Sequence, residues 1–186
     1  MKKFSGINFA VLIWVITFAS CSSPEEKMKS QIQELESGLY ADSSMVPDTG
    51  VSGKIIDMYI SYAEKFPNDT LSPVYLFKAG DVASKMNETH RAIEIFDNLK
   101  KNFPEHRNAP YALFLQGFIC ETQEGNPAKA RPYYEEFLKK YPDHPIVSDV
   151  AFSLENLGKT PEELILEFEK NNAAQVSAET TEKTTK

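Results

Sequence analysis

Apolar residues recur at helical spacing along most of the chain, and they do so in the same order before three similar phrases. The phrases are EKFPND at 64–69, KNFPEH at 101–106 and KKYPDH at 139–144, and their prolines are 37 and 38 residues apart. Positions 12, 8, 5 and 1 before each proline lie along one helical face. They hold Ile55, Tyr59, Tyr62 and Phe66 before Pro67; Ala92, Phe96, Leu99 and Phe103 before Pro104; and Ala130, Tyr134, Phe137 and Tyr141 before Pro142. Because proline cannot continue a helix, each phrase predicts the end of an amphipathic helix.

A further apolar segment precedes the second and the third of these helices, and we expect it to form the antiparallel partner. These segments are 72–86 and 109–122. Ser72, which stands before a proline, is typical of an N-cap, and Asn126 opens the last helix in the same way. Gly80 and Gly117 lie mid-helix, where glycine costs about 1 kcal/mol relative to alanine unless close packing requires it. The two glycines therefore predict close approach of the paired helices.

The flanking segments are less regular. An apolar stripe predicts a first helix over 24–39, and the polar residues that follow predict a loop over 40–53. Residues 171–186 have no apolar period and predict a disordered tail.

The segment after the third phrase predicts a shortened helix pair, formed by 148–158 and 160–170. Thr160 and Glu163 match a capping box at the start of the second of these helices. A terminal repeat is expected to be atypical because it must face water.

The second and third units together resemble the tetratricopeptide repeat family. The family pattern has a large apolar residue, a glycine, an alanine, an aromatic residue and a closing proline. It falls on Leu76, Gly80, Ala92, Phe96 and Pro104, and again on Leu113, Gly117, Ala130, Tyr134 and Pro142. Both units are longer than the family period of about 34, and such longer links resemble BamD-like and Pal-associated envelope lipoproteins. The resemblance implies an all-α fold, a short right-handed superhelix of antiparallel helix pairs.

The N-terminus is typical of a secretory signal with a lipid attachment site. Lys2 and Lys3 precede an apolar run over 9–19, which is short for a membrane span and suits the apolar region of a signal peptide. Ala19-Ser20-Cys21 resembles the lipobox of bacterial lipoproteins, in which the cysteine receives diacylglycerol and palmitate and becomes the mature N-terminus. An uncleaved membrane anchor is the alternative. The expected organisation is a signal peptide over 1–20, the lipid anchor with the first helix and loop over 21–52, helical repeats over 53–170 and the tail over 171–186.

The residues after Cys21 bear on the location of the protein. Ser22 lacks the aspartate associated with inner-membrane retention, so the resemblance to lipoproteins implies the outer membrane, on its periplasmic or its surface side. Glu25-Glu26 is similar to a surface-export signal, and it is equally the start of a helix capped by Ser23. The net charge of −7 argues against a nucleic-acid partner.

The chain shows no constellation typical of catalysis, so we expect no enzyme activity, no cofactor and no metal. His90, His106 and His144 lie at or near helix ends without a second ligand at a metal-binding offset. Cys120 lies in an apolar helix, where a core position is expected. The triplet Asp69-Thr70-Leu71 resembles an O-glycosylation site, and a turn between repeats explains the same residues.

The resemblance also implies a binding groove, because the first helix of each family repeat lines the concave surface. The ligand-facing offsets fall on Val74, Phe77, Asp81, Tyr111, Phe114 and Phe118. This set is mainly aromatic, so we expect a peptide segment of an envelope protein to bind there. The alternative is that these residues are core.

The expected function is that of a non-catalytic scaffold for protein interactions, anchored to the outer membrane by lipid, and the resemblance to BamD-like proteins suggests a role in outer-membrane protein assembly. A surface lipoprotein that serves a glycan-binding, transport or enzyme complex is the alternative.

Overall fold

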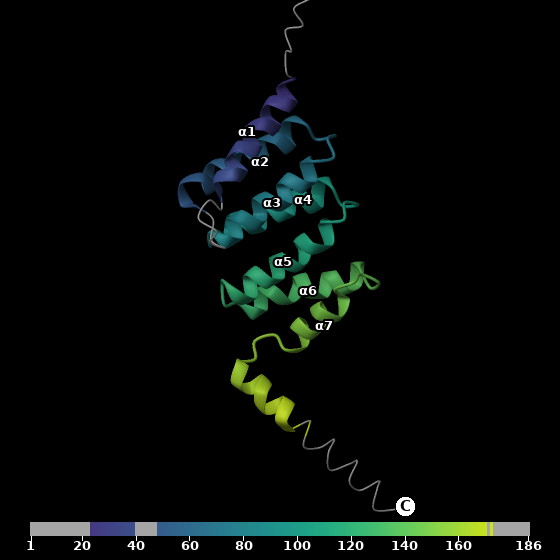
Figure 1. The fold of residues 1–186 in the computed structure, drawn as a ribbon. Helices are drawn as coiled ribbons and strands as arrows, with labels where there is room; N and C mark the ends of the chain where they lie inside the picture. Colours follow the sequence, from purple (N-terminus) through teal and green to yellow (C-terminus); the bar gives the residue numbers. More distant parts are fainter. Residues whose placement is uncertain (1–22, 40–47, 171, 173–186) are drawn as a thin grey trace, which may run out of the picture.

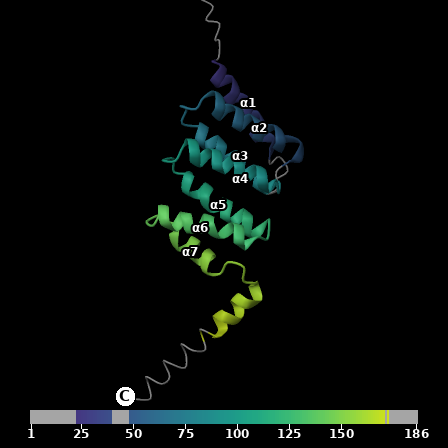
Figure 2. The same ribbon diagram turned by 180° about the vertical axis from the view of Figure 1, so that it is seen from behind.

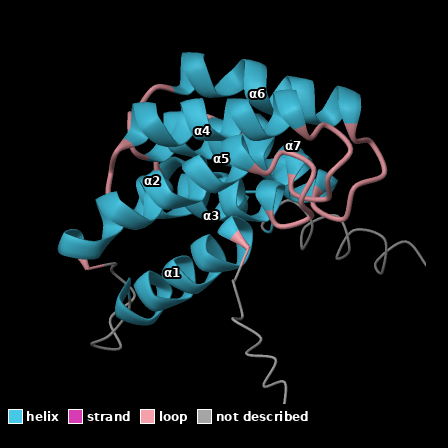
Figure 3. Cartoon of the chain, turned by 90° about the horizontal axis from the view of Figure 1, so that it is seen from above, coloured by secondary structure: helices cyan, strands magenta, loops and turns pink. Residues whose placement is uncertain are grey.

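The computed structural model describes residues 23–39, 48–170 and 172. Over these residues the chain forms helices and loops, with no strand (Figure 3). The labelled helices are α1 (Pro24–Leu39), α2 (Thr49–Lys65), α3 (Ser72–Lys85), α4 (Thr89–Asn102), α5 (Ala109–Thr122), α6 (Pro127–Lys140) and α7 (Val147–Glu155). A further helix, 161–170, follows α7. None of the helices in this part of the chain has the length and apolar character needed to cross a membrane.

Consecutive helices pack against one another and form an elongated stack (Figures 1 and 2). Helices α1 and α2 form the first pair, α3 and α4 the second, and α5 and α6 the third, with α7 packed on α6. Two clusters of buried side chains fill the stack, one from α1 to α5 and one from α5 to α7, and Ile93 of α4 packs against both. The predicted all-α stack of antiparallel pairs is confirmed.

The repeated phrases end helices α2, α4 and α6 with the same turn. The aromatic residue before each proline donates its N–H to the carbonyl four residues earlier, as in Phe103 to Leu99 at 2.8 Å. The apolar residues that precede it along one face are buried: Ile55, Tyr59 and Tyr62; Ala92, Phe96 and Leu99; and Ala130, Tyr134 and Phe137. The predicted helix ends and buried faces are confirmed.

The two mid-helix glycines each leave a gap that an aromatic ring of the paired helix fills, and we call this gap a socket. A Cβ atom at Gly80 would lie 2.5 Å from the nearest ring carbon of Phe96. At Gly117 it would lie 2.6 Å from the ring of Tyr134. No side chain tolerates such distances, so close packing of the pairs requires glycine at both positions.

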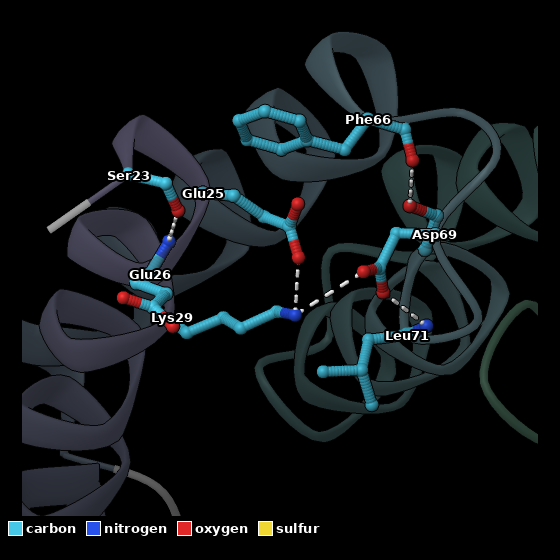
Figure 4. A network of polar contacts seen from close by, with 8 residues as sticks. Ser23, Glu25, Glu26, Lys29, Phe66, Asp69 and Leu71 are labelled. Carbon is cyan, nitrogen blue, oxygen red and sulfur yellow. Dashed lines mark hydrogen bonds and ion pairs between the residues drawn. The ribbon is translucent and has the colours of Figure 1, made fainter.

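A polar network around Lys29 attaches the first helix to the turn between α2 and α3 (Figure 4). The Lys29 ammonium lies 2.5 Å from Glu25 and 3.1 Å from Asp69. Asp69 also accepts the N–H of Leu71 at 2.7 Å. The carboxylate of Glu25, followed by Tyr62 and Asp69, raises the pKa of Lys29 above its ordinary value. One ammonium thus joins two carboxylates that are far apart in the sequence.

Two local predictions were wrong. The predicted loop over 40–53 is too long, because α2 begins at Thr49, where Asp48 accepts the N–H groups of Gly50 and Val51. Ser72 is not an N-cap. It is buried, and its hydroxyl donates to the carbonyl of Phe66 at 2.5 Å. Asn126 does cap α6, through the N–H of Lys129.

The predicted pair after the third phrase forms as two helices that do not pack together. The capping box is confirmed, since Thr160 donates its N–H to Glu163 and accepts the N–H of Glu163. Helix 161–170 nevertheless lies away from the stack (Figure 1), and none of its residues belongs to either buried cluster. Only α7 continues the packed array.

Some predictions fall on residues outside the described part of the chain. They are the signal peptide at 1–20, the lipid site Cys21, most of the loop at 40–47, and the tail at 171 and 173–186.

Candidate docking surface

The six residues predicted to bind a partner lie on the first helices of the second and third pairs. Val74, Phe77 and Asp81 come from α3, and Tyr111, Phe114 and Phe118 come from α5. They occupy matching positions 3, 6 and 10 residues after the cap residues Leu71 and Asn108. We call the four aromatic residues Phe77, Tyr111, Phe114 and Phe118 the aromatic strip.

Phe118 and Phe114 form the best-developed part of the strip. Their ring centroids are 6.0 Å apart, and Phe114 also lies 5.9 Å from Tyr134 of α6. Phe114 is half-buried, whereas Phe118 remains 43% exposed. An apolar ring that is exposed beside another aromatic ring offers contact area that a partner could bury.

Tyr111 lies one helical turn before Phe114 and is 37% exposed. Its ring meets His144 edge to face, with centroids 5.0 Å apart, and His144 in turn meets Phe137 at 5.5 Å. The turn between α6 and α7 therefore supports Tyr111 from one side, which limits its freedom before any partner binds.

Phe77 has a more structural position. It is half-buried, and its ring centroid lies 5.8 Å from Phe96, the residue that fills the Gly80 socket. The strip therefore contains both residues suited to binding a partner and residues suited to the core. Phe77 and Phe114 pack inside their pairs, while Tyr111 and Phe118 face solvent.

The two remaining predicted residues are less suited to an anchoring role. Asp81 forms an ion pair with Lys85 one turn later at 2.9 Å, so its charge is already partly balanced. Val74 is half-buried. Beside them, Gln123 after α5 donates to the carbonyl and the hydroxyl of Ser84 on α3, at 3.1 and 3.0 Å. This bridge joins the ends of the two helices that carry the strip.

Sequence reasoning missed Phe152 of α7, which is 63% exposed. It lies ten residues after Pro142, as Phe77 and Phe114 lie ten residues after their own prolines. Counting from the phrase prolines would have revealed it. The strip position therefore recurs on three successive first helices.

The histidines of the second and third phrases, His106 and His144, have a structural role in the turns between pairs. The Nδ1 atoms of His106 and His144 accept the N–H groups two residues later, at 3.2 and 3.4 Å, as the carboxylate of Asp69 does in the first phrase. Burial and the nearby Arg107 lower the pKa of His106. These side chains thus close the turns between pairs.

The remaining candidates offer little chemistry. Cys120 is buried, and burial, followed by the charge of Glu124, raises the pKa of its thiol, which disfavours a reactive thiolate. Within the described segments, no three His, Cys, Asp or Glu side chains are grouped so that they could hold a metal ion.

Comparison with known proteins supports the helical repeat. The family model described as the tetratricopeptide repeat matches residues 75–106 and 111–144, which are the second and third pairs with their turns. No curated protein matches the chain. The match supports a tetratricopeptide repeat protein, and helical repeats of this kind offer extended surfaces for binding other proteins.

Proposed function

We propose that the protein is a non-catalytic, lipid-anchored scaffold of the bacterial envelope that binds a segment of another envelope protein along the aromatic strip. The observation that carries the proposal is the exposure of Tyr111 and Phe118 on a first helix of the matched repeats. Aromatic side chains supply much of the binding energy in protein interfaces because they bury a large area at low entropic cost.

The strip suits a short helical or extended segment with apolar side chains. Tyr111, Phe114 and Phe118 follow one another along a single helix, at spacings of three and four residues. A segment that lies along α5 can place successive apolar side chains against them. The half-buried rings of Phe77 and Phe114 would line the bottom of the binding surface, and the exposed rings of Tyr111 and Phe118 would make most of the contact with the partner.

The lipid anchor is proposed from the N-terminal sequence. An apolar run over 9–19 precedes Cys21, and Ser22 lacks the aspartate of inner-membrane retention. The first helix begins at Pro24, only three residues after Cys21. Three residues span at most about 11 Å, so lipidation at Cys21 would hold the helical stack next to the outer membrane. A partner in outer-membrane protein assembly would fit such a position.

The experiment compares partner capture by tagged protein in cells after chemical crosslinking. The double variant Tyr111→Ala, Phe118→Ala removes the two exposed rings, and we expect it to lose the partner while its melting temperature stays within a few degrees of wild type. His90→Ala on α4, whose side chain is 87% exposed, is the control and should retain capture. Intact capture by the double variant would place the binding site elsewhere.

A further inference from the structure

An aromatic pair joins the two helices of the second and third pairs. Phe77 meets Phe96 at 5.8 Å, and Phe114 meets Tyr134 at 5.9 Å. In both pairs the aromatic residue of the first helix is six residues after the N-cap of that helix. The aromatic residue of the second helix is eight residues after the N-cap of the second helix. The second and third pairs therefore share the positions of these two aromatic residues.

The C-terminal segment also carries an aromatic residue at each of these two offsets, but its two cap residues are 14 residues apart, against 17 and 18 in the second and third pairs. Phe152 is six residues after Ile146, the cap residue of α7, and Phe168 is eight residues after Thr160, the cap of helix 161–170. Both rings nevertheless face solvent, at 63% and 66% exposure. The fourth pair thus has its contact residues but remains open.

The short link and the residue at position 155 both distinguish α7 from the first helices of the closed pairs. Glu155 lies nine residues after Ile146, at the position that Gly80 and Gly117 hold in α3 and α5. A single Cβ atom at Gly80 would come within 2.5 Å of the facing ring, and Glu155 brings a whole side chain to the corresponding place. No socket for Phe168 exists on α7.

The charges of the two helices also disfavour packing of helix 161–170 against α7. Residues 147–170 contain six acids and two lysines, with acids on both helices: Asp149, Glu155, Glu162, Glu163, Glu167 and Glu169. Like charges brought together repel, which disfavours closure within the chain. The same repulsion disfavours a dimer in which each copy covers the other.

The two ends of the stack differ in what they expose. On α1 the apolar residues Met28, Ile32 and Leu39 face the core and polar residues face solvent, as expected for the capping helix of a repeat array. At the other end Ile165, Leu166 and Phe168 are 58%, 65% and 66% exposed. An exposed apolar group of this size is typical of an interaction site.

We propose that α7 and helix 161–170, here named the open end, bind an amphipathic helix of a partner protein whose apolar stripe is flanked by lysine or arginine. The apolar stripe would cover Phe152, Ile165 and Phe168, which are 63%, 58% and 66% exposed. The flanking cations would complement the acidic residues of this surface. These acidic residues would also speed association with a basic partner and disfavour an acidic one. This surface is separate from Tyr111 and Phe118 of the aromatic strip.

The test measures binding of a synthetic helical peptide with a leucine stripe flanked by lysines, by fluorescence anisotropy. The protein used spans 21–186 with Cys21→Ser, and it contains every residue that the structure describes. We expect the peptide to bind at least about tenfold more tightly than the same peptide with glutamates in place of its lysines, and more weakly at high salt.

Two variants locate the peptide. Phe168→Ala should weaken binding at least about tenfold, as expected for a central aromatic anchor, whereas His90→Ala on α4, outside both proposed surfaces, should leave it unchanged. The proposal is overturned if both peptides bind equally, or if Phe168→Ala weakens binding no more than His90→Ala does. A dimer in sedimentation that Phe168→Ala dissociates would show that a second copy occupies the open end, and would also overturn it.

Glu155→Gly tests the cause of the open state. This change creates a socket on α7, so helix 161–170 should close, its amide hydrogens should exchange more slowly, and peptide binding should weaken at least about tenfold because closure hides both rings. Glu155→Gln keeps the bulk of the side chain and should change binding less than about threefold. Identical exchange and binding in the two variants would refute Glu155 as the block to closure.

Discussion

The replacement Gly80→Ala adds one methyl group at the glycine of the described residues where a Cβ atom would lie closest to a neighbouring atom. Its Cβ would meet three carbons of the Phe96 ring at 2.5, 2.7 and 2.8 Å. The ring cannot easily move away, because Phe96 is fully buried and also packs against Phe77. The clash must therefore be relieved by separating α3 from α4.

Two effects of opposite sign determine the size of the loss. Alanine is favoured over glycine within a helix by about 1 kcal/mol. Overpacking of a dense core costs roughly 1–3 kcal/mol, and three contacts below 3 Å place this site at the upper end. We expect Gly80→Ala to lower the free energy of unfolding by about 2 kcal/mol, and the melting temperature by roughly 4–8 °C for a chain of this size.

Gly53→Ala is the matched control, because it makes the same substitution within α2 where no other atom lies within 4 Å of the added Cβ. It should raise the free energy of unfolding by up to about 1 kcal/mol. Urea denaturation measures both changes. In the background of Phe96→Ala, which removes the ring, Gly80→Ala should no longer destabilise. If Gly80→Ala stabilised the protein as much as Gly53→Ala, the packing of the second pair would be wrong.

Three other predictions can be checked separately. Phe96→Ala should lower the free energy of unfolding by about 3–5 kcal/mol, because the ring is fully buried, and an unshifted urea midpoint would contradict its place in the core. Burial alone would raise the pKa of Asp69, but the N–H of Leu71 and the ammonium of Lys29 outweigh it and hold the pKa below its ordinary value. Asp69 should therefore stabilise the fold above about pH 4 and lose this contribution as the pH falls through its folded pKa. Asp69→Asn should lower the free energy of unfolding, measured by urea denaturation, and this loss should become smaller as the pH falls. A loss that is the same at every pH would exclude the ion pair as its cause. Cys21→Ser should leave the signal peptide uncleaved, as seen by a larger mass, and a variant that still reaches membranes at mature size would exclude lipidation.

Much of the fold could be predicted from the sequence because the repeat places the same chemistry at the same offsets. The proline of each phrase stands just after an apolar helical face and disfavours further helix there, so the phrases identified the ends of α2, α4 and α6. The spacing of apolar residues before each phrase identified the buried face. Gly80 and Gly117 predicted close packing, and each faces a ring across its pair.

The errors arose where a contact distant in the sequence decides the local structure. Ser72 has the sequence context of a cap, but its hydroxyl meets the carbonyl of Phe66, which only the folded turn brings near. The expected closure of helix 161–170 failed for a similar reason. Its own pattern is that of a second helix, and the proposed obstacle, Glu155 on α7, can be recognised only by comparison with the glycine positions of α3 and α5.

The predicted strip combines two kinds of residue that a sequence pattern cannot separate. Phe77 and Phe118 are both aromatic residues on the same predicted face. The ring of Phe77 packs against Phe96, whereas Phe118 keeps 43% of its surface exposed. The difference depends on the side chains of the paired helix that each ring contacts. The helical period of the sequence does not predict these contacts.

The central claim is that a partner segment binds over the exposed rings of α5. The most direct measurement places a photo-crosslinking amino acid at Phe118 in cells and, as a control, at the exposed His90 of α4. We expect one adduct from position 118, its loss when Tyr111→Ala is added, and no such adduct from position 90. No adduct at position 118, or the same adduct from both positions, would contradict it.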